Sequence, residues 1–223
     1  MAELIAIDTP DGLVLEAEYC AAQGSTRAGA VLCHPHPQYG GTMRSLVISV
    51  LFEALPPLGV ACLRFNYRGV ENSTGAYGEG VGERLDVLAA LDGLNKSRGA
   101  EVLVGRPEIP IGLIGWSFGA DMALSTHDPR VAGWMGIALP MRFIGTDDRG
   151  VQPRGIDAVA DDTRPKLLAL AQHDEFRDAE WVIEATREWT NTRVEVVAGA
   201  SHFFVGRTDR LVALATGFVA SLL

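Results

Sequence analysis

The sequence predicts an α/β protein with a mostly parallel sheet of about eight strands and helices on both faces. Short apolar runs alternate with segments in which apolar residues recur at helical spacing. The central runs, such as AGAVLC and IGLIGW, are continuously apolar, as in strands that are buried on both faces. No linker-like or repetitive stretch interrupts this series, so we expect one domain over residues 1–223.

The chain opens with a predicted antiparallel hairpin. ELIAID and LVLEAEYC flank TPDG, and Pro-Asp-Gly is turn chemistry. AGAVLCHP then predicts a buried strand. The segment after it places one apolar face on a helix through Met43, Leu46, Val47, Val50, Leu51 and Ala54. Two prolines, Pro56 and Pro57, end this helix because proline cannot continue it.

Strands and helices continue to alternate as far as the C-terminus. GVACLRFNY, IGLIGWS, VAGWMGIALP, KLLALAQHD and RVEVVAGA predict strands. Helices are expected at residues 79–95, at FGADMALSTH, at residues 178–189 and over the last apolar stripe of the chain. Residues 140–164 are polar and glycine-rich, and they form either a small flap over one end of the sheet or a surface excursion. Loops of this length in compact domains are often functional.

Composition and charge exclude several classes of protein. A net charge of −9 makes nucleic acid and anionic membranes poor partners. The longest apolar region is cut by Glu53 and by two prolines, and the start lacks a signal-peptide pattern. Three cysteines in apolar surroundings indicate buried free thiols and a reducing compartment. We therefore expect a cytoplasmic protein, and a homodimer paired through the edge of the opening hairpin stays an alternative.

Ser117 is the first candidate for chemistry, because it lies between two glycines where a buried strand should end. In GWSFG the serine must occupy a sharp turn from strand to helix. Such a turn crowds the backbone two positions before and two positions after the serine, where only small residues fit. The pattern predicts a nucleophile elbow that holds the serine oxygen clear of the sheet.

A serine nucleophile needs a base and an acid that orients the base. His202 follows the last predicted strand, and Asp174 ends the strand KLLALAQHD. Loops at the carboxyl ends of parallel strands converge, so these groups can reach Ser117. We predict His202 as the base and Asp174 as the acid. The neighbouring Glu175 and the upstream Asp157, Asp161 and Asp162 could take the place of Asp174.

The reaction also needs donors for the oxyanion of the tetrahedral intermediate. We expect the backbone N–H of Phe118, at the start of the elbow helix, and that of His36, in the loop CHPHPQYGGTM. Trp116, Tyr39 and Phe203 are the predicted residues of the substrate pocket. His34 and His36 have the spacing of a metal pair, but no nearby ligand completes the set, so neither a metal nor another cofactor is expected.

These pieces together resemble the α/β-hydrolases over nearly all of the chain, and most of all the small capless branch near the dienelactone hydrolases. The matching segments are HPHPQYGGTM, RFNYRGV, GWSFGAD and the loops of Asp174 and His202. Well-known dienelactone hydrolases use a cysteine nucleophile, whereas this elbow carries Ser117, so lactone specificity is not implied. Glu71 stands where relatives often have glycine, so we expect that loop to be reshaped. Asn66 and Arg68 beside it are expected to bond loop carbonyls.

The resemblance implies a serine hydrolase that acts on esters or related acyl compounds without a cofactor. We expect a carboxylic esterase for small-molecule substrates with short or accessible acyl groups, working through an acyl-enzyme. Thioester cleavage, acyl transfer and peptide release would use the same groups, and a non-catalytic binding protein on the same fold is a further alternative.

Overall fold

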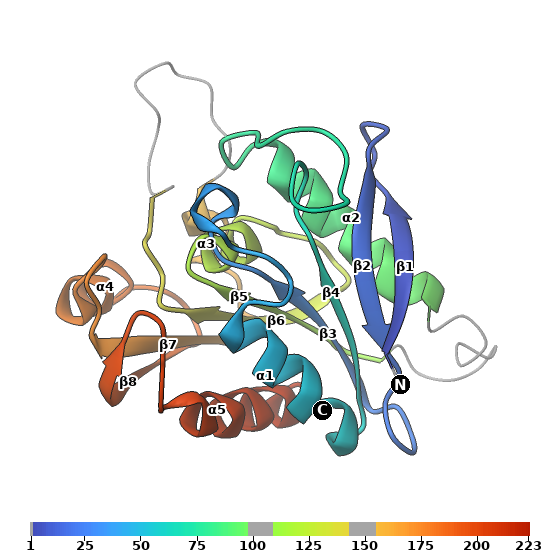
Figure 1. Ribbon diagram of the computed structural model, residues 1–223. Coiled ribbons are helices and arrows are strands. Elements are labelled where there is room, and N and C mark those ends of the chain that lie inside the picture. The colour runs from blue at the N-terminus through green and yellow to red at the C-terminus, as the bar shows by residue number, and fades with distance from the viewer. Residues whose placement is uncertain (1, 98–108, 143–154) are drawn as a thin grey trace.

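The computed structural model describes residues 2–97, 109–142 and 155–223, and within these ranges eight strands form one sheet (Figure 1). The order across the sheet is β1-β2-β4-β3-β5-β6-β7-β8. In chain order the strands are β1 (Ala2–Asp8), β2 (Val14–Cys20), β3 (Ala28–Cys33), β4 (Val60–Phe65), β5 (Ile111–Trp116), β6 (Val131–Ile137), β7 (Lys166–His173) and β8 (Thr192–Ser201). β1 pairs antiparallel with β2, and β2 with β4, while all pairs from β4 to β8 are parallel.

Helices cover both faces of this sheet, which confirms the predicted fold class. They are α1 (Leu46–Ala54), α2 (Gly82–Ser97), α3 (Phe118–Leu124), α4 (Ala179–Ala185) and α5 (Thr208–Ser221). One apolar cluster lies between the sheet and α2, α3 and α4, and a second lies between the sheet and α1 and α5 (Figure 1). None of the helices in the described ranges has both the length and the apolar character needed to cross a bilayer.

The continuous apolar runs are explained by burial on both faces. Every residue of β3 and β5 is buried. Along β3, Val31 and Cys33 enter the cluster with α2, whereas Ala30 and Leu32 enter the cluster with α1. This alternation follows from the two-residue period of a strand.

The helix after β3 begins later than its apolar spacing predicts. Met43 is fully buried, but it lies in a turn before α1. The Thr42 N–H donates to the Ser45 hydroxyl, and the Ser45 N–H donates to the Thr42 carbonyl. This turn ends at Ser45, so α1 starts at Leu46.

The predicted excursion over residues 140–164 is described at its two ends, and residues 143–154 lie outside the described residues. After these residues, the first regular element of the chain is a 3₁₀ turn at Ile156–Val159. Ile156 and Val159 are fully buried in the cluster that contains α3. This end of the segment is therefore part of the core, while the flap and the single domain stay predictions.

Candidate active site

Ser117 occupies the turn between β5 and α3, with φ +56° and ψ −123°. Side chains rarely adopt a positive φ, and such strain is typical of functional turns. The Ser117 N–H donates to the Ile137 carbonyl of β6 at 2.8 Å, which holds the strained turn against the sheet. The turn has the form expected of a nucleophile elbow.

The two glycines around Ser117 are required by close backbone contacts. A Cβ at Gly115 would lie 2.0 Å from the Gly119 carbonyl oxygen. A Cβ at Gly119 would lie 2.1 Å from the Cys33 carbonyl oxygen, at the end of β3. The glycines thus let α3 approach the sheet closely enough to bring Ser117 beside the β3 loop, as the crowding argument from the sequence predicts.

His202 and Asp174 lie beside this serine in a hydrogen-bonded chain. The distance from His202 Nε2 to Ser117 Oγ is 2.9 Å, and His202 Nδ1 lies 2.9 and 3.0 Å from the two carboxylate oxygens of Asp174. Both side chains are deeply buried, with 6% and 4% of their surfaces exposed. With the proton on Nδ1 donated to Asp174, Nε2 is free to accept the hydroxyl proton of Ser117.

The turn after β7 explains why Asp174, rather than Glu175, orients the ring. Asp174 Oδ1 accepts hydrogen bonds from the N–H groups of Phe176 and Arg177 at 2.9 and 3.2 Å, which fixes the carboxylate toward His202. Glu175 instead accepts from the His202 backbone N–H at 3.2 Å. Asp162, one of the three upstream aspartates, pairs with Arg164 away from the site.

Trp116 is hydrogen-bonded to the backbone of His202, a contact that sequence reasoning missed. Its indole N–H donates to the His202 carbonyl at 3.1 Å, across 86 residues of chain. Trp116 is 5% exposed and immediately precedes Ser117. The residue therefore ties the elbow to the loop of the base, in addition to the predicted place on the pocket wall.

The loop after β3 is built around two histidines with different roles. His34 Nδ1 lies 2.6 Å from the Pro35 carbonyl, and His34 Nε2 accepts from the Tyr67 N–H at 3.1 Å. Burial lowers the pKa of His34 to about 3, so the ring stays neutral. Both of its nitrogens are occupied, so His34 has none left for a metal, and the described residues contain no cluster of metal-ligand type.

His36 caps the 3₁₀ turn Pro37–Tyr39 and faces the site. Its Nδ1 accepts from the Gln38 N–H at 3.2 Å, and its Nε2 lies 3.2 Å from the Tyr77 hydroxyl. Burial first, and the positive charge of Arg142 second, lower the pKa of His36. The backbone of His36 lies in the loop expected to carry an oxyanion donor.

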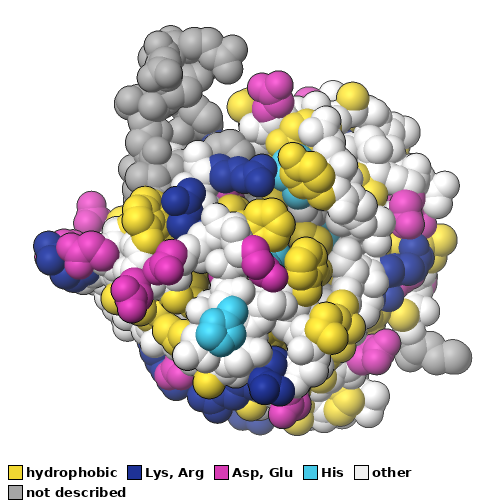
Figure 2. All heavy atoms as spheres, turned by 60° about the vertical axis from the view of Figure 1, so that its left-hand side comes forward, with side chains coloured by type: hydrophobic (Ala, Val, Ile, Leu, Met, Phe, Trp, Pro, Cys, Tyr) yellow, Lys and Arg dark blue, Asp and Glu magenta, His cyan; other side chains and the backbone are white. Residues whose placement is uncertain are grey.

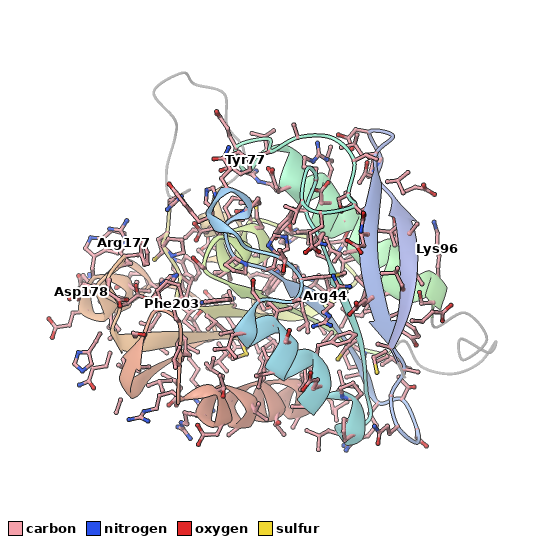
Figure 3. The ribbon with its side chains drawn as sticks, viewed as in Figure 1. Arg44, Tyr77, Lys96, Arg177, Asp178 and Phe203 are labelled. Atoms are coloured by element: carbon pink, nitrogen blue, oxygen red, sulfur yellow. The ribbon has the colours of Figure 1, made fainter. Side chains whose placement is uncertain are left out.

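A cavity of about 410 Å³ opens over Ser117 and His202, and all three predicted pocket residues line it. Trp116 is a buried part of the lining, while Tyr39 and Phe203 lie at the rim with 79% and 48% of their surfaces exposed. Figure 2 turns this end of the sheet forward and shows hydrophobic side chains gathered over partly covered histidines. Figure 3 labels two aromatic residues of this end of the molecule: Phe203, on the left, follows β8, and Tyr77, near the top, precedes α2.

A larger cavity of about 460 Å³ lies at the opposite end of the sheet, between the start of β3 and the end of α5. Its lining is formed by residues such as Arg27, Leu58 and Val219, and it contains no member of the Ser117 site. Volume alone therefore does not identify the site, whereas the cavity over Ser117 combines apolar walls with convergent polar groups.

Asp121 is a second residue that sequence reasoning missed. It lies one helical turn after Ser117, is fully buried and accepts from the N–H groups of Met141 and Arg142 at 3.1 and 3.0 Å. Burial raises the pKa of Asp121 to about 7, although these two hydrogen bonds oppose the effect. The sequence feature that could have identified Asp121 is that it is the one carboxylate within the apolar helix segment FGADMAL.

The loop with Asn66 and Arg68 is structural, as expected, but its side-chain partners are not carbonyls. Asn66 accepts from the Met43 N–H at 2.8 Å and donates to Glu16 and Glu71. Arg68 pairs with the buried Asp86 at 2.7 Å and with Asp11 at 2.9 Å. Charged groups at this depth require such partners, because an unpaired buried charge is costly.

Glu71 keeps the backbone conformation that a glycine favours. Its φ is +48°, in the left-handed region. Its carboxylate accepts from Asn66 Nδ2 at 2.7 Å and pairs with Arg44 at 3.2 Å. These contacts offset the strain of the left-handed backbone, which is about 1–2 kcal/mol for a residue with a side chain.

Comparisons with known proteins agree with this architecture, although no family model matches the chain. An uncharacterized protein of Rickettsia prowazekii is 29% identical over 209 residues, which is 90% of this chain and 81% of that protein. The solved structure of an α/β serine hydrolase homologue from Coxiella burnetii is 31% identical, with a TM-score of 0.81 over 99% of this chain and 97% of that chain. An α/β serine hydrolase without a lid from Xanthomonas campestris is 25% identical, with a TM-score of 0.77 over 100% of this chain and 95% of that chain.

Proposed function

The chain belongs to the α/β serine hydrolases, and from this we propose that it cleaves carboxylic esters with short or accessible acyl groups. Ser117 is the proposed nucleophile, His202 the base and Asp174 the group that orients His202. The observation that carries the proposal is the hydrogen-bonded chain from Ser117 Oγ through His202 to Asp174, with each contact at 2.9 or 3.0 Å.

Acylation begins when Ser117 Oγ attacks the acyl carbon of the ester. His202 Nε2, at 2.9 Å, takes the hydroxyl proton and becomes an imidazolium. Asp174 stabilises that charge and keeps the ring in the tautomer that exposes Nε2. His202 then returns the proton to the alcohol oxygen as the carbon–oxygen bond breaks, and the acyl group remains on Ser117.

The negative oxygen of the tetrahedral intermediate needs donors that are already in position. The proposed donors are the backbone N–H groups of Phe118 and His36. Phe118 begins α3, whose N-terminus carries partial positive charge. The His36 carbonyl accepts from the N–H groups of Tyr39 and Gly41, both at 3.1 Å, which supports a fixed backbone at His36.

Deacylation repeats the same steps with water. His202 takes a proton from a water molecule, the hydroxide attacks the acyl carbon, and the Ser117 oxygen leaves with the proton that His202 returns. The open rim formed by Tyr39 and Phe203 admits water and suits acyl groups that do not need enclosure. The lidless relative from Xanthomonas campestris supports an accessible site of this kind.

The test is turnover of p-nitrophenyl acetate together with labelling by a fluorophosphonate probe. Ser117→Ala should abolish labelling and reduce turnover by roughly 10⁴-fold or more. Ser125→Ala is the matched control. It removes a serine hydroxyl at the other end of α3, and that hydroxyl donates to the Asp121 carbonyl and not to the Ser117 site. Wild-type protein that neither turns over the ester nor reacts with the probe would overturn the proposal.

A panel of esters, thioesters and amides with the same acyl group then separates ester cleavage from the other reactions that this nucleophile supports. Amides have poorer leaving groups than aryl esters, so an esterase should show a far larger kcat/KM on esters. Faster cleavage of the thioester or the amide than of the matched alkyl ester would assign the chain to a different reaction.

A further inference from the structure

The cavity over Ser117 carries one permanent charge, although the whole chain has a net charge of −9. Its described lining contains one arginine, Arg142, and no aspartate or glutamate. A cationic wall in an acidic protein is a feature that the hydrolysis of a neutral ester does not require.

Arg142 also differs from most arginines of the described residues, because it forms no ion pair with any of them. Eight others lie within 4 Å of a carboxylate, namely Arg44, Arg64, Arg68, Arg130, Arg164, Arg187, Arg193 and Arg210. The charge of Arg142 acts on the buried Asp121, but no ion pair within 4 Å joins the Arg142 guanidinium to a carboxylate of the described residues. Arginine binds carboxylates through two parallel hydrogen bonds, so such a guanidinium in the lining of a cavity is suited to an anionic ligand.

The backbone of Arg142 is fixed in place from within the protein. Asp121 Oδ2 accepts the Arg142 N–H at 3.0 Å, and Asp121 Oδ1 accepts the Met141 N–H at 3.1 Å. Arg177 donates to the Pro140 carbonyl at 3.0 Å from the other side. The segment that ends at Arg142 is therefore clamped between α3 and the turn after β7, although Met141 has φ +51°.

Much of the remaining lining of the cavity is apolar and aromatic. Trp116, Phe176 and Phe203 lie around His202, with the Phe176 and His202 ring centroids 4.5 Å apart. Leu46 adds an aliphatic surface. The cavity thus offers hydrocarbon contact beside the nucleophile and a cation at another point of its wall, which is the pattern of a site for a ligand with an apolar body and one polar end.

We propose that the substrates are monoesters of dicarboxylic acids, in which the ester lies at Ser117 and the free carboxylate of the acyl part binds Arg142. This proposal rests on the proposed ester hydrolysis and adds the class of acyl group. Ser117 Oγ attacks the ester carbon and the alcohol leaves with the proton that His202 returns. Water then attacks the acyl carbon, the bond to Ser117 Oγ breaks, and the dicarboxylic acid leaves. The free carboxylate bound to Arg142 takes no part in bond making. Arg142 is therefore proposed to select the acyl group of the substrate and not to act in the reaction itself.

The experiment compares two esters that differ only in charge: the mono-p-nitrophenyl ester of adipic acid and its methyl-capped diester. Wild-type protein should show a kcat/KM ratio that favours the anionic ester by roughly 10-fold or more, since charge-assisted hydrogen bonds are strong in a cavity. Arg142→Ala should reduce this ratio by roughly 10- to 100-fold, mainly through KM for the anion. Arg142→Lys should restore part of it, because lysine keeps the charge but loses the bidentate geometry.

Arg193→Ala is the control, because it removes an exposed arginine of β8 outside the cavity and should leave the ratio unchanged. Raising the salt concentration from about 0.05 to 0.5 M should lower the wild-type ratio through screening. A ratio near 1 that Arg142→Ala does not change, with both esters turned over, would overturn this inference alone. Wild-type protein that is inert to both esters and to the fluorophosphonate probe would overturn the proposed function, and this inference with it.

Discussion

Gly119→Ala tests the claim that the elbow depends on close backbone contact. A methyl group at residue 119 would lie 2.1 Å from the Cys33 carbonyl oxygen and 2.5 Å from the His34 carbonyl oxygen. Both obstacles are backbone atoms, so neither can rotate away, and α3 must move from the end of β3 by about 1 Å. Overpacking of this kind costs about 1–3 kcal/mol, and alanine's better helix propensity recovers about 1 kcal/mol at most.

The expected result is a lower melting temperature and a larger loss of activity. For a domain of this size, 1 kcal/mol corresponds to about 2–4 °C in Tm, so a net cost of up to about 2 kcal/mol should lower Tm by up to about 8 °C. A displacement of α3 by about 1 Å also moves Ser117 relative to His202, and misplacement on that scale costs about 10²-fold in rate. The measurements are thermal unfolding by circular dichroism and kcat for p-nitrophenyl acetate.

Gly217→Ala is the matched control, because residue 217 lies within α5 and a methyl group there would meet no atom within 4 Å. This change should raise stability by about 0.5–1 kcal/mol, as expected for glycine replaced in a helix, and leave turnover unchanged. If Gly119→Ala gave the Tm and kcat of Gly217→Ala, the contact between α3 and the end of β3 would not constrain the elbow, and the reasoning would fail.

Two further predictions concern buried contacts around the site. Trp116→Phe removes the N–H donor to the His202 carbonyl, so it should destabilise the fold by about 1–3 kcal/mol and reduce kcat by about 10-fold, measured by urea unfolding and steady-state kinetics. An unchanged kcat would show that Trp116 does not position the base. Glu71→Gly and Glu71→Ala both lose the bonds to Asn66 and Arg44, but only alanine keeps the left-handed strain. The glycine variant should be more stable by about 1 kcal/mol in urea, and equal stabilities would contradict the strain argument.

Much of the fold was predictable because its signals are local. Continuous apolar runs marked β3 and β5, and helical spacing marked α2 and α5. The apolar spacing wrongly predicted that Met43 lies on the face of a helix. Met43 instead lies in a buried turn, where its N–H donates to Asn66 Oδ1, 23 residues further along the chain. Apolar periodicity records burial, and it does not distinguish a helix face from a buried turn that precedes the helix.

The candidate site was predictable for those residues whose position is set by the ends of the strands. Ser117, Asp174 and His202 each follow a parallel strand, so the sheet itself brings them to one edge. The donor role of Trp116 and the clamp by Asp121 were not predictable, because they depend on contacts between elements 86 and 20 residues apart. Such contacts depend on how side chains pack between distant elements, and the local spacing of apolar residues in the sequence does not report on that packing.

Asp121 gives the clearest prediction for pH. Burial raises its pKa to about 7 in the folded protein, against 3.8 for an ordinary aspartate. The charges that face it are those of Arg142 and Arg177, and both favour its ionised form. Because the folded state binds the proton more tightly than the unfolded chain, the stability linked to Asp121 is fully present below about pH 4 and is lost as pH rises to about 7.

Asp121→Asn removes this dependence, since its neutral amide has about the same shape but does not titrate. Between about pH 5 and pH 8, the wild-type protein should lose about 2–3 kcal/mol relative to the variant, or roughly 5–10 °C in Tm. The measurement is the difference in Tm between the two proteins across that range. The amide still places an NH₂ group against the Met141 or Arg142 N–H, so the variant should start less stable at the acidic end of that range and approach or pass the wild type at its basic end. A difference that does not change with pH would mean that Asp121 holds the Arg142 segment as a permanently charged or permanently neutral group, and the raised pKa would then be wrong.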